Sequence, residues 1–136
     1  MLDFLQTINT VTNGSTVILG GVAKWQNGYG TEPTSKFIDI AVTPQQTSSL
    51  DTLGTRLEIQ GGTTFPTPVQ EQYVLKTDNY ILDVFVVNEL PQSTLISGSN
   101  IQTPEADVQF HTSLYDAQPN DYILGKLNER RTLYGL

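Results

Sequence analysis

Short segments in which apolar and polar residues alternate most limit the folds open to this sequence. In KFIDIAVT, residues 36–43, the alternation places Ile38, Ile40 and Val42 on one side of an extended chain. A period of two is typical of a strand with one buried face. The same interpretation predicts a strand in DVQFHTSLY, residues 107–115, with three apolar side chains directed inward, namely Val108, Phe110 and Leu114.

Further segments fit the same pattern. TRLEIQ (55–60) would turn Leu57 and Ile59 inward, and YILDVFVV (80–87), apolar on both faces, predicts a central strand covered on two sides. STVILGGV (15–22) and VQEQYVL (69–75) are weaker candidates. Segments rich in Gly, Pro, Asn and Asp separate these runs, as turns and loops require.

Helical patterns are few. An N-terminal helix is predicted from Leu2, Phe4, Leu5 and Ile8, and one or two helical turns from TSSLDTLG, where Ser48 and Asp51 have capping-box spacing. We therefore expect a mainly β protein: a single-domain β-sandwich or small β-barrel with one or two short helices. Its one β-rich domain would span residues 1–136, with 126–136 as a possible C-terminal interaction arm.

One tripeptide, Tyr-Ile-Leu, occurs twice after an Asn/Asp pair. The chain has DNYILDVF at 78–85 and NDYILGKL at 120–127. The two copies diverge directly afterwards, whereas a true internal repeat shows similarity over a whole structural unit. We interpret them as two strands that begin in the same way.

The charge of the chain argues against two classes of partner. A net charge of -7 would repel a phosphate backbone, so specific nucleic-acid binding is not expected. No apolar run is long enough to span a membrane, and the N-terminus does not resemble a signal peptide. Positive charge is concentrated near the C-terminus: residues 126–136 contain three basic residues, Lys126, Arg130 and Arg131, and one acidic residue, Glu129.

Catalytic and cofactor motifs are not found. The single histidine, His111, would lie on the exposed face of its predicted strand, and no G-x-S-x-G elbow accompanies it. NGYGTEP lacks the glycine spacings that cradle phosphates. Paired carboxylates for glycoside hydrolysis stay open, because their separation is a three-dimensional property. We predict no catalytic and no cofactor-binding residue.

Metal sites are similarly unsupported. With one His and no Cys, zinc is excluded. Calcium stays open at two acidic segments, but neither has the D-x-[DN]-x-[DN]-G pattern: Asp116, Asn120 and Asp121, and Glu105 and Asp107. Four aromatic residues in or near loops could stack on a sugar or close the ends of the core: Trp25, Tyr29, Phe65 and Tyr73. No metal ligand is predicted.

The overall character of the chain resembles a family. An alternating KFIDIAVTP strand, Gly/Pro-rich loops, few lysines, no cysteine and a tail ending in NERRTLYGL are similar to small virion proteins of tailed bacteriophages. These are proteins of the head-tail connector, stopper or tail-completion kind. The resemblance implies a ring-forming structural protein of the phage neck or tail, located in the virion after assembly in the host cytoplasm, and not an enzyme.

The residues themselves leave other functions open. The alternative is a carbohydrate- or ligand-binding β-sandwich, and a hydrolase acting through carboxylates comes third. Missing motifs and exposed strand edges favour a homo-oligomer that contacts other virion structural proteins. Its subunit interface would use the C-terminal segment, through Arg130, Arg131, Leu133 and Tyr134.

Overall fold

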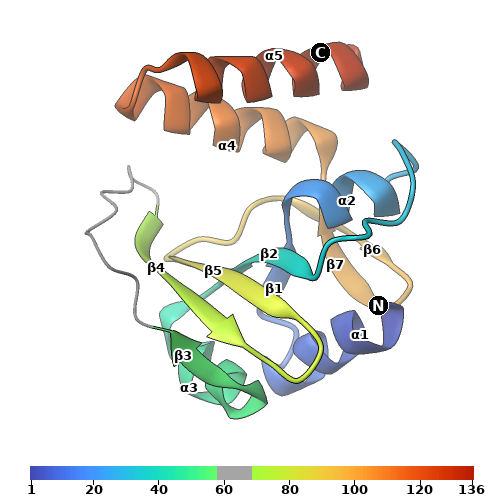
Figure 1. Ribbon diagram of the computed structural model, residues 1–136, viewed down its shortest axis with the longest axis vertical. Coiled ribbons are helices and arrows are strands. Elements are labelled where there is room, and N and C mark those ends of the chain that lie inside the picture. Colours follow the sequence, from blue (N-terminus) through green and yellow to red (C-terminus); the bar gives the residue numbers. More distant parts are fainter. Residues whose placement is uncertain (58–68) are drawn as a thin grey trace.

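The chain folds into a seven-stranded mixed sheet with helices on both faces (Figure 1). The computed structural model describes residues 1–57 and 69–136. The strand order is β3-β4-β5-β2-β1-β7-β6. The strands are β1 (Thr16–Ile18), β2 (Phe37–Val42), β3 (Thr55–Leu57), β4 (Val69–Lys76), β5 (Ile81–Val87), β6 (Ser93–Ile96) and β7 (Ser99–Gln102).

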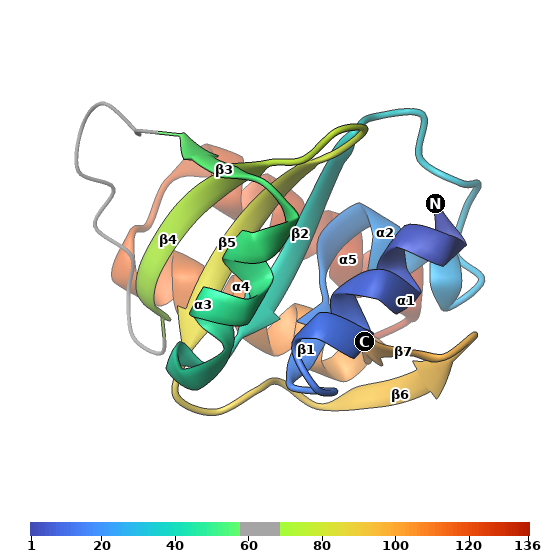
Figure 2. The ribbon, with the colours of Figure 1, turned by 90° about the horizontal axis from the view of Figure 1, so that it is seen from below.

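The helices form two layers around this sheet. Helices α4 and α5 lie together over one face, while α1 and α3 lie on the other (Figures 1 and 2). The helices are α1 (Leu2–Val11), α2 (Gly20–Gln26), α3 (Thr47–Leu50), α4 (Pro104–Ala117) and α5 (Asp121–Tyr134), with 3-10 turns η1 (Pro44–Gln46) and η2 (Asp51–Leu53). Among the described residues, no helix combines the length and apolar character needed to cross a lipid bilayer.

The expected β-sandwich or β-barrel is therefore wrong, and the fold is mixed α/β. Strands β2 and β5 are parallel, as are β1 and β7, while the other pairs are antiparallel. Parallel strands are usually covered on both faces, as they are here. This arrangement leaves the central strands between two separate apolar layers.

The alternation in β2 and β5 was interpreted correctly and explains both layers. Ile38, Ile40 and Val42 are fully buried in the larger core, toward α1 and α3. Phe85 and Val87 join a smaller core on the opposite face, against Phe110 of α4. The central position of β5 is confirmed, as are strands at β1 and β4.

The segment 107–115 is not a strand but the middle of α4. Thr103 caps this helix by accepting a hydrogen bond from the Ala106 N–H (3.1 Å), and Pro104 occupies its first turn. The residues directed toward the rest of the fold have the spacing of a helix: Asp107, Phe110, His111 and Leu114. The prediction of a strand was wrong because the apolar residues of this segment fit both the period of a strand and the period of a helix.

The second Tyr-Ile-Leu segment is also helical, at the start of α5. The Asn120 side chain accepts a hydrogen bond from the Ile123 N–H (2.9 Å), which fixes the first turn. In the first copy, Thr77 and Tyr80 close a tight turn between β4 and β5, and the chain continues as a strand. The interpretation as two equivalent strands is wrong for the second copy.

The remaining local predictions have mixed outcomes. The N-terminal helix is confirmed as α1, and Gly54 follows η2. The short helix at 47–50 forms, but without a side-chain cap. β3 is present, although Leu57 is 42% exposed and not inward. Ile59 and Phe65 lie outside the described residues.

Candidate functional site

Two carboxylates lie side by side on the face of the sheet that α4 and α5 cover. Asp39 of β2 and Asp83 of β5 are partners in the parallel register, and both are half-buried. Neighbouring strands are about 4.8 Å apart, so two acids in register on one face are close neighbours. Their strands place them between apolar residues in sequence, where an acid needs a specific role or partner.

Burial and mutual repulsion disfavour the charged state of this Asp39–Asp83 pair. Burial, followed by the charge of Asp83, raises the pKa of Asp39 to about 6, although the charges of Arg130, His111 and Lys126 oppose this. Burial also raises the pKa of Asp83, against a hydrogen bond from Gln72. The pair is therefore suited to take up a positive charge.

A glycine adjoins the Asp39 carboxylate. Gly20 has a φ of +61°, and a Cβ atom there would lie 2.7 Å from Oδ2 of Asp39. Both the backbone conformation and the contact require glycine. The Leu19 N–H donates to the Asp39 carbonyl (2.8 Å), which ties the start of α2 to β2. The Gly20–Gly21 segment thus leaves open space directly in front of the acid.

A cavity of about 450 Å³ opens there between the sheet, α2, α4 and α5. Besides Asp39 and the two glycines, its lining includes three cations and two further acids: Lys24, Lys126, Arg130, Asp107 and Glu129. Within residues 1–57 and 69–136, Lys24 and Lys126 form no ion pair. The cavity thus combines one acid of the pair with two unneutralised cations.

A buried amide completes this first cavity. Gln102 of β7 is 1% exposed and lines the cavity, and neither polar atom of its side chain has a hydrogen-bond partner among the described residues. A buried amide without partners costs free energy. Its donor and acceptor are therefore available to a polar ligand.

A second buried acid, Asp107 of α4, has the opposite surroundings. Tyr134 donates to Asp107 Oδ2 (2.6 Å), Arg130 Nε lies 3.1 Å from the same oxygen, and His111 Nδ1 lies 2.9 Å from Oδ1. Burial alone would raise the pKa of Asp107, but the hydrogen bonds from His111 and Tyr134, with the charges of His111 and Arg130, lower it. This Asp107 cluster joins α4 to α5.

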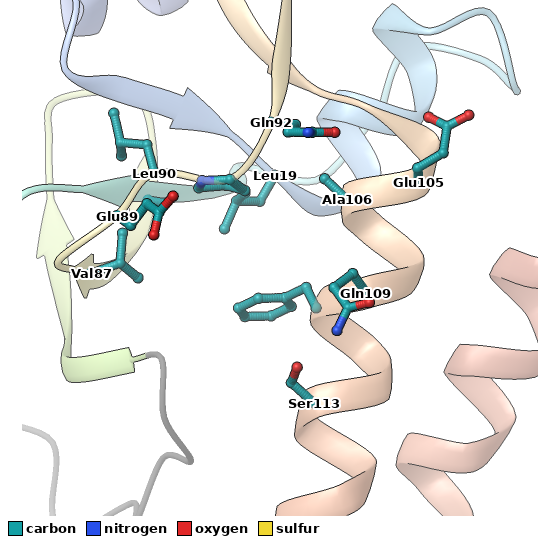
Figure 3. Close-up of a pocket in the computed structure, with 12 residues that line it drawn as sticks. Leu19, Val87, Glu89, Leu90, Gln92, Glu105, Ala106, Gln109 and Ser113 are labelled. Carbon is teal, nitrogen blue, oxygen red and sulfur yellow. The ribbon is translucent and has the colours of Figure 1, made fainter.

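A second cavity, of about 480 Å³, lies between the sheet and α4 (Figure 3). Its walls come from the segment after β5 and from one side of α4. Leu19 and Phe110 line both cavities, so the two share a boundary at the end of β1. A molecule bound in each would meet near these two residues.

His111 and three of the aromatic residues considered from the sequence do not lie where the sequence predicted. His111 is not an exposed strand residue: it lies on α4, its side chain is only 15% exposed, and it contacts Asp107. Tyr73 is buried in the larger core, Trp25 packs against that core, and Tyr29 packs edge-on against Tyr134 at 5.0 Å.

The C-terminal interface prediction stays a prediction. Arg130 and Tyr134 of α5 contact Asp107 within the chain, whereas Arg131 and Leu133 are exposed. The two calcium candidates lie at the start of α4 and at the α4–α5 connection. In the described part of the chain, no group of three or more His, Cys, Asp or Glu residues is arranged to hold a metal.

Sequence reasoning missed the Asp39–Asp83 pair and the glycines beside it. Two signals were present in the sequence. One is a single acid inside each of two otherwise apolar strands, FIDIAV and ILDVFVV, and the other is the Gly-Gly step at residues 20 and 21, shortly after strand β1. The prediction of no catalytic, cofactor-binding or metal-binding residue gave these acids no role. Only the register of β2 and β5 brings them together.

Two solved structures share the fold of this chain. The chain is similar to the crystal structure of ANT(2'')-Ia in complex with adenylyl-2''-tobramycin, with a TM-score of 0.59, 15% identity, and coverage of 96% of this chain and 87% of that one. It is also similar to the solution structure of the antibiotic-resistance factor ANT(2'')-Ia, with a TM-score of 0.53, 15% identity, and 97% and 85% coverage.

These similarities show that the chain has a nucleotidyltransferase fold, the fold of ANT(2'')-Ia. No protein-family model matches the chain, and no curated protein matches its sequence. The resemblance to phage virion proteins is therefore wrong, and so are the predicted neck or tail role, the virion location and the carbohydrate-binding sandwich. The expectation of a non-enzyme is contradicted as well.

Proposed function

We propose that the protein is a nucleotidyltransferase, which moves a nucleoside monophosphate from a nucleoside triphosphate to a hydroxyl group of a small acceptor. The observation that carries the proposal is the Asp39–Asp83 pair beside a cavity with unneutralised lysines, in a fold shared with ANT(2'')-Ia. One of those solved structures holds an adenylylated tobramycin. The fold and the chemistry of the cavity support the same reaction class.

The donor atoms fit a magnesium ion that arrives with the nucleotide. Magnesium is commonly bound by one or two carboxylates together with substrate phosphates. Asp39 and Asp83 would supply the carboxylates, and Asp39 lines the first cavity. When bound, the ion would neutralise charge on the phosphates. Burial is the main reason that the pKa of both acids is raised, and neither acid forms an ion pair with a described residue.

The chain's other residues in the first cavity would position the triphosphate. Lys24 from α2 and Lys126 from α5 both line this cavity, and their positive charges attract phosphate oxygens. The free amide of Gln102 can donate to, or accept from, the nucleotide. Phosphoryl transfer depends mostly on such positioning and charge stabilisation.

The reaction also needs a general base to take a proton from the hydroxyl group of the small acceptor molecule. The acceptor's hydroxyl oxygen bonds to the α-phosphorus, the bond from this phosphorus to the oxygen bridging to the β-phosphate breaks, and pyrophosphate leaves. His111 lines the cavity, and Asp107 holds its Nδ1, so Nε2 can take the hydroxyl proton. In this assignment, the Asp107 cluster orients the base.

Calorimetric titration with each of ATP, GTP, CTP and UTP tests the proposal. In the presence of magnesium, at least one nucleotide should bind, and Asp39→Asn should weaken its binding at least about tenfold, a loss of about 1.4 kcal/mol. Asp78→Asn removes an equal charge from the turn before β5 and should bind normally. If no nucleotide binds, or if Asp39→Asn binds as well as the native protein, the proposal is wrong.

A further inference from the structure

The two adjoining cavities differ in charge. The first contains three cations beside three acids, namely Lys24, Lys126 and Arg130 beside Asp39, Asp107 and Glu129, whereas the described residues that line the second include no Lys, Arg or His. Instead, the second has Glu89 on one wall and Glu105 at the first turn of α4 (Figure 3). Neither glutamate forms an ion pair within the described segments of the chain. An anionic nucleotide is therefore favoured only in the first cavity.

The floor of the second cavity is apolar. Leu19, Ala41 and Val87 come from the sheet, and Phe110 faces them from α4. The ring of Phe110 is held edge-on against Phe85, with 5.6 Å between centroids. Such a floor rewards a ligand with an apolar body of its own, because each apolar group transferred from water contributes to binding.

We infer that the second cavity binds an organic cation with an apolar ring system, held by the floor around Phe110 and by the carboxylate of Glu89. That this cation is the acceptor of the nucleotide rests on the proposed nucleotidyl transfer. That the cation binds in the second cavity does not depend on that proposal. A hydroxyl on such a ligand could reach the first cavity past Leu19, which both cavities share. The acceptor would then differ from a purely polar, polycationic amino sugar, which has little apolar surface to place on this floor.

The two glutamates are expected to contribute differently to binding of the cation. Glu89 follows β5 and lies on the wall opposite α4, facing the ligand space (Figure 3). Glu105 is in the first turn of α4, where an acid also stabilises the helix N-terminus. The charge that recognises the ligand is therefore assigned to Glu89, with Glu105 adding only to the general negative potential at the mouth.

Two dyes of similar size and opposite charge test this inference. Thioflavin T is a flat apolar cation, and 8-anilinonaphthalene-1-sulfonate is an apolar anion; each becomes more fluorescent when bound. The native protein should bind thioflavin T saturably and more tightly than the anion. Glu89→Gln should weaken thioflavin T about threefold to fivefold, as for a partly exposed ion pair, and strengthen the anion.

Two further variants separate the cavity from general attraction to an acidic protein. Ala106→Phe places a ring in the cavity from α4 and should abolish saturable dye binding without removing core atoms. Asp78→Asn lies at the opposite end of β5 and should leave both affinities unchanged. If native protein prefers the anion, or if Glu89→Gln and Asp78→Asn have equal effects, the inference is overturned.

Nucleotide titration of the same samples keeps the two proposals distinct. Nucleotide binding without selective dye binding would overturn the cationic acceptor pocket alone. Dye binding that depends on Glu89, without nucleotide binding, would support the pocket and overturn the nucleotidyltransferase assignment. Ala106→Phe should still bind nucleotide, because Ala106 does not line the first cavity.

Discussion

The molecule contains two groups of buried carboxylates with opposite surroundings. Asp107 has a tyrosine hydroxyl, a guanidinium and an imidazole within hydrogen-bonding distance. Asp39 and Asp83 form no ion pair with a described residue, and Asp83 accepts one hydrogen bond from the amide of Gln72. As a result, the pKa of Asp107 is lowered, while the pKa of both members of the pair is raised.

This difference separates an acid that stabilises the fold from acids that are held for a ligand. A compensated acid costs stability when it is removed, because its partners are left buried and unpaired. An uncompensated pair destabilises the protein until a cation neutralises it. Lowering the pH should therefore change the contributions of the two groups to stability in opposite directions. Substitution of the acids should do the same.

The largest expected effect comes from Asp107→Ala. It would leave Arg130 and Tyr134 buried without their acceptor, so the free energy of unfolding should fall by about 3–5 kcal/mol. Urea denaturation at neutral pH measures this change. Asp116→Ala, at an exposed position on the same helix, should change it by less than about 0.5 kcal/mol. Equal effects at both positions would show that the Asp107 cluster does not hold α4 to α5.

Asp39→Asn should instead stabilise the protein without ligand, by about 1–3 kcal/mol above pH 7. Because the pKa of Asp39 is raised to about 6, its contribution is fully favourable below the ordinary value of 3.8 and is lost as pH rises through about 6. The gain from the substitution should therefore vanish near pH 4. Denaturation curves of both proteins across this range give the comparison. A constant difference at all pH values would contradict the raised pKa.

A smaller effect is expected at the glycine in front of Asp39. Gly20→Ala places a Cβ in the left-handed backbone region and against Oδ2 of Asp39, at a cost of about 1–2 kcal/mol. Gly21→Ala is the matched control, because nothing lies within 4 Å of its Cβ position. Thermal unfolding should rank Gly21→Ala above Gly20→Ala. The reverse order would remove the argument that Gly20 shapes the site.

The sequence predicted the strands of the fold better than its helices. The alternation in residues 36–43 and 80–87 located β2 and β5, whose buried faces have a period of two. Residues 107–115 also alternate, yet Asp107, Phe110, His111 and Leu114 have helical spacing, and local pattern alone does not choose between the two. Tyr-Ile-Leu forms a strand start in one place and a helix start in another, because the Asn120 cap and the Thr77 turn decide locally.

The candidate site was beyond this reasoning for a different physical reason. Asp39 and Asp83 are far apart in the chain and meet only through the parallel register of β2 and β5. Two of the three partners of Asp107, Arg130 and Tyr134, likewise reach it only when α5 packs on α4. Each acid was visible in the sequence, but its partners, and hence its pKa and role, are properties of the tertiary structure.

The most direct test of whether the Asp39–Asp83 pair is the functional site is thermal unfolding, measured without ligands and with magnesium and the bound nucleotide together. The native protein should unfold at a higher temperature with both ligands present. Asp39→Asn and Asp83→Asn should start from a higher temperature and show little further increase. Asp107→Asn should start lower and still show an increase of about the native size. If the ligands stabilise Asp39→Asn and Asp83→Asn as much as the native protein, the pair is not the nucleotide site and the account is wrong.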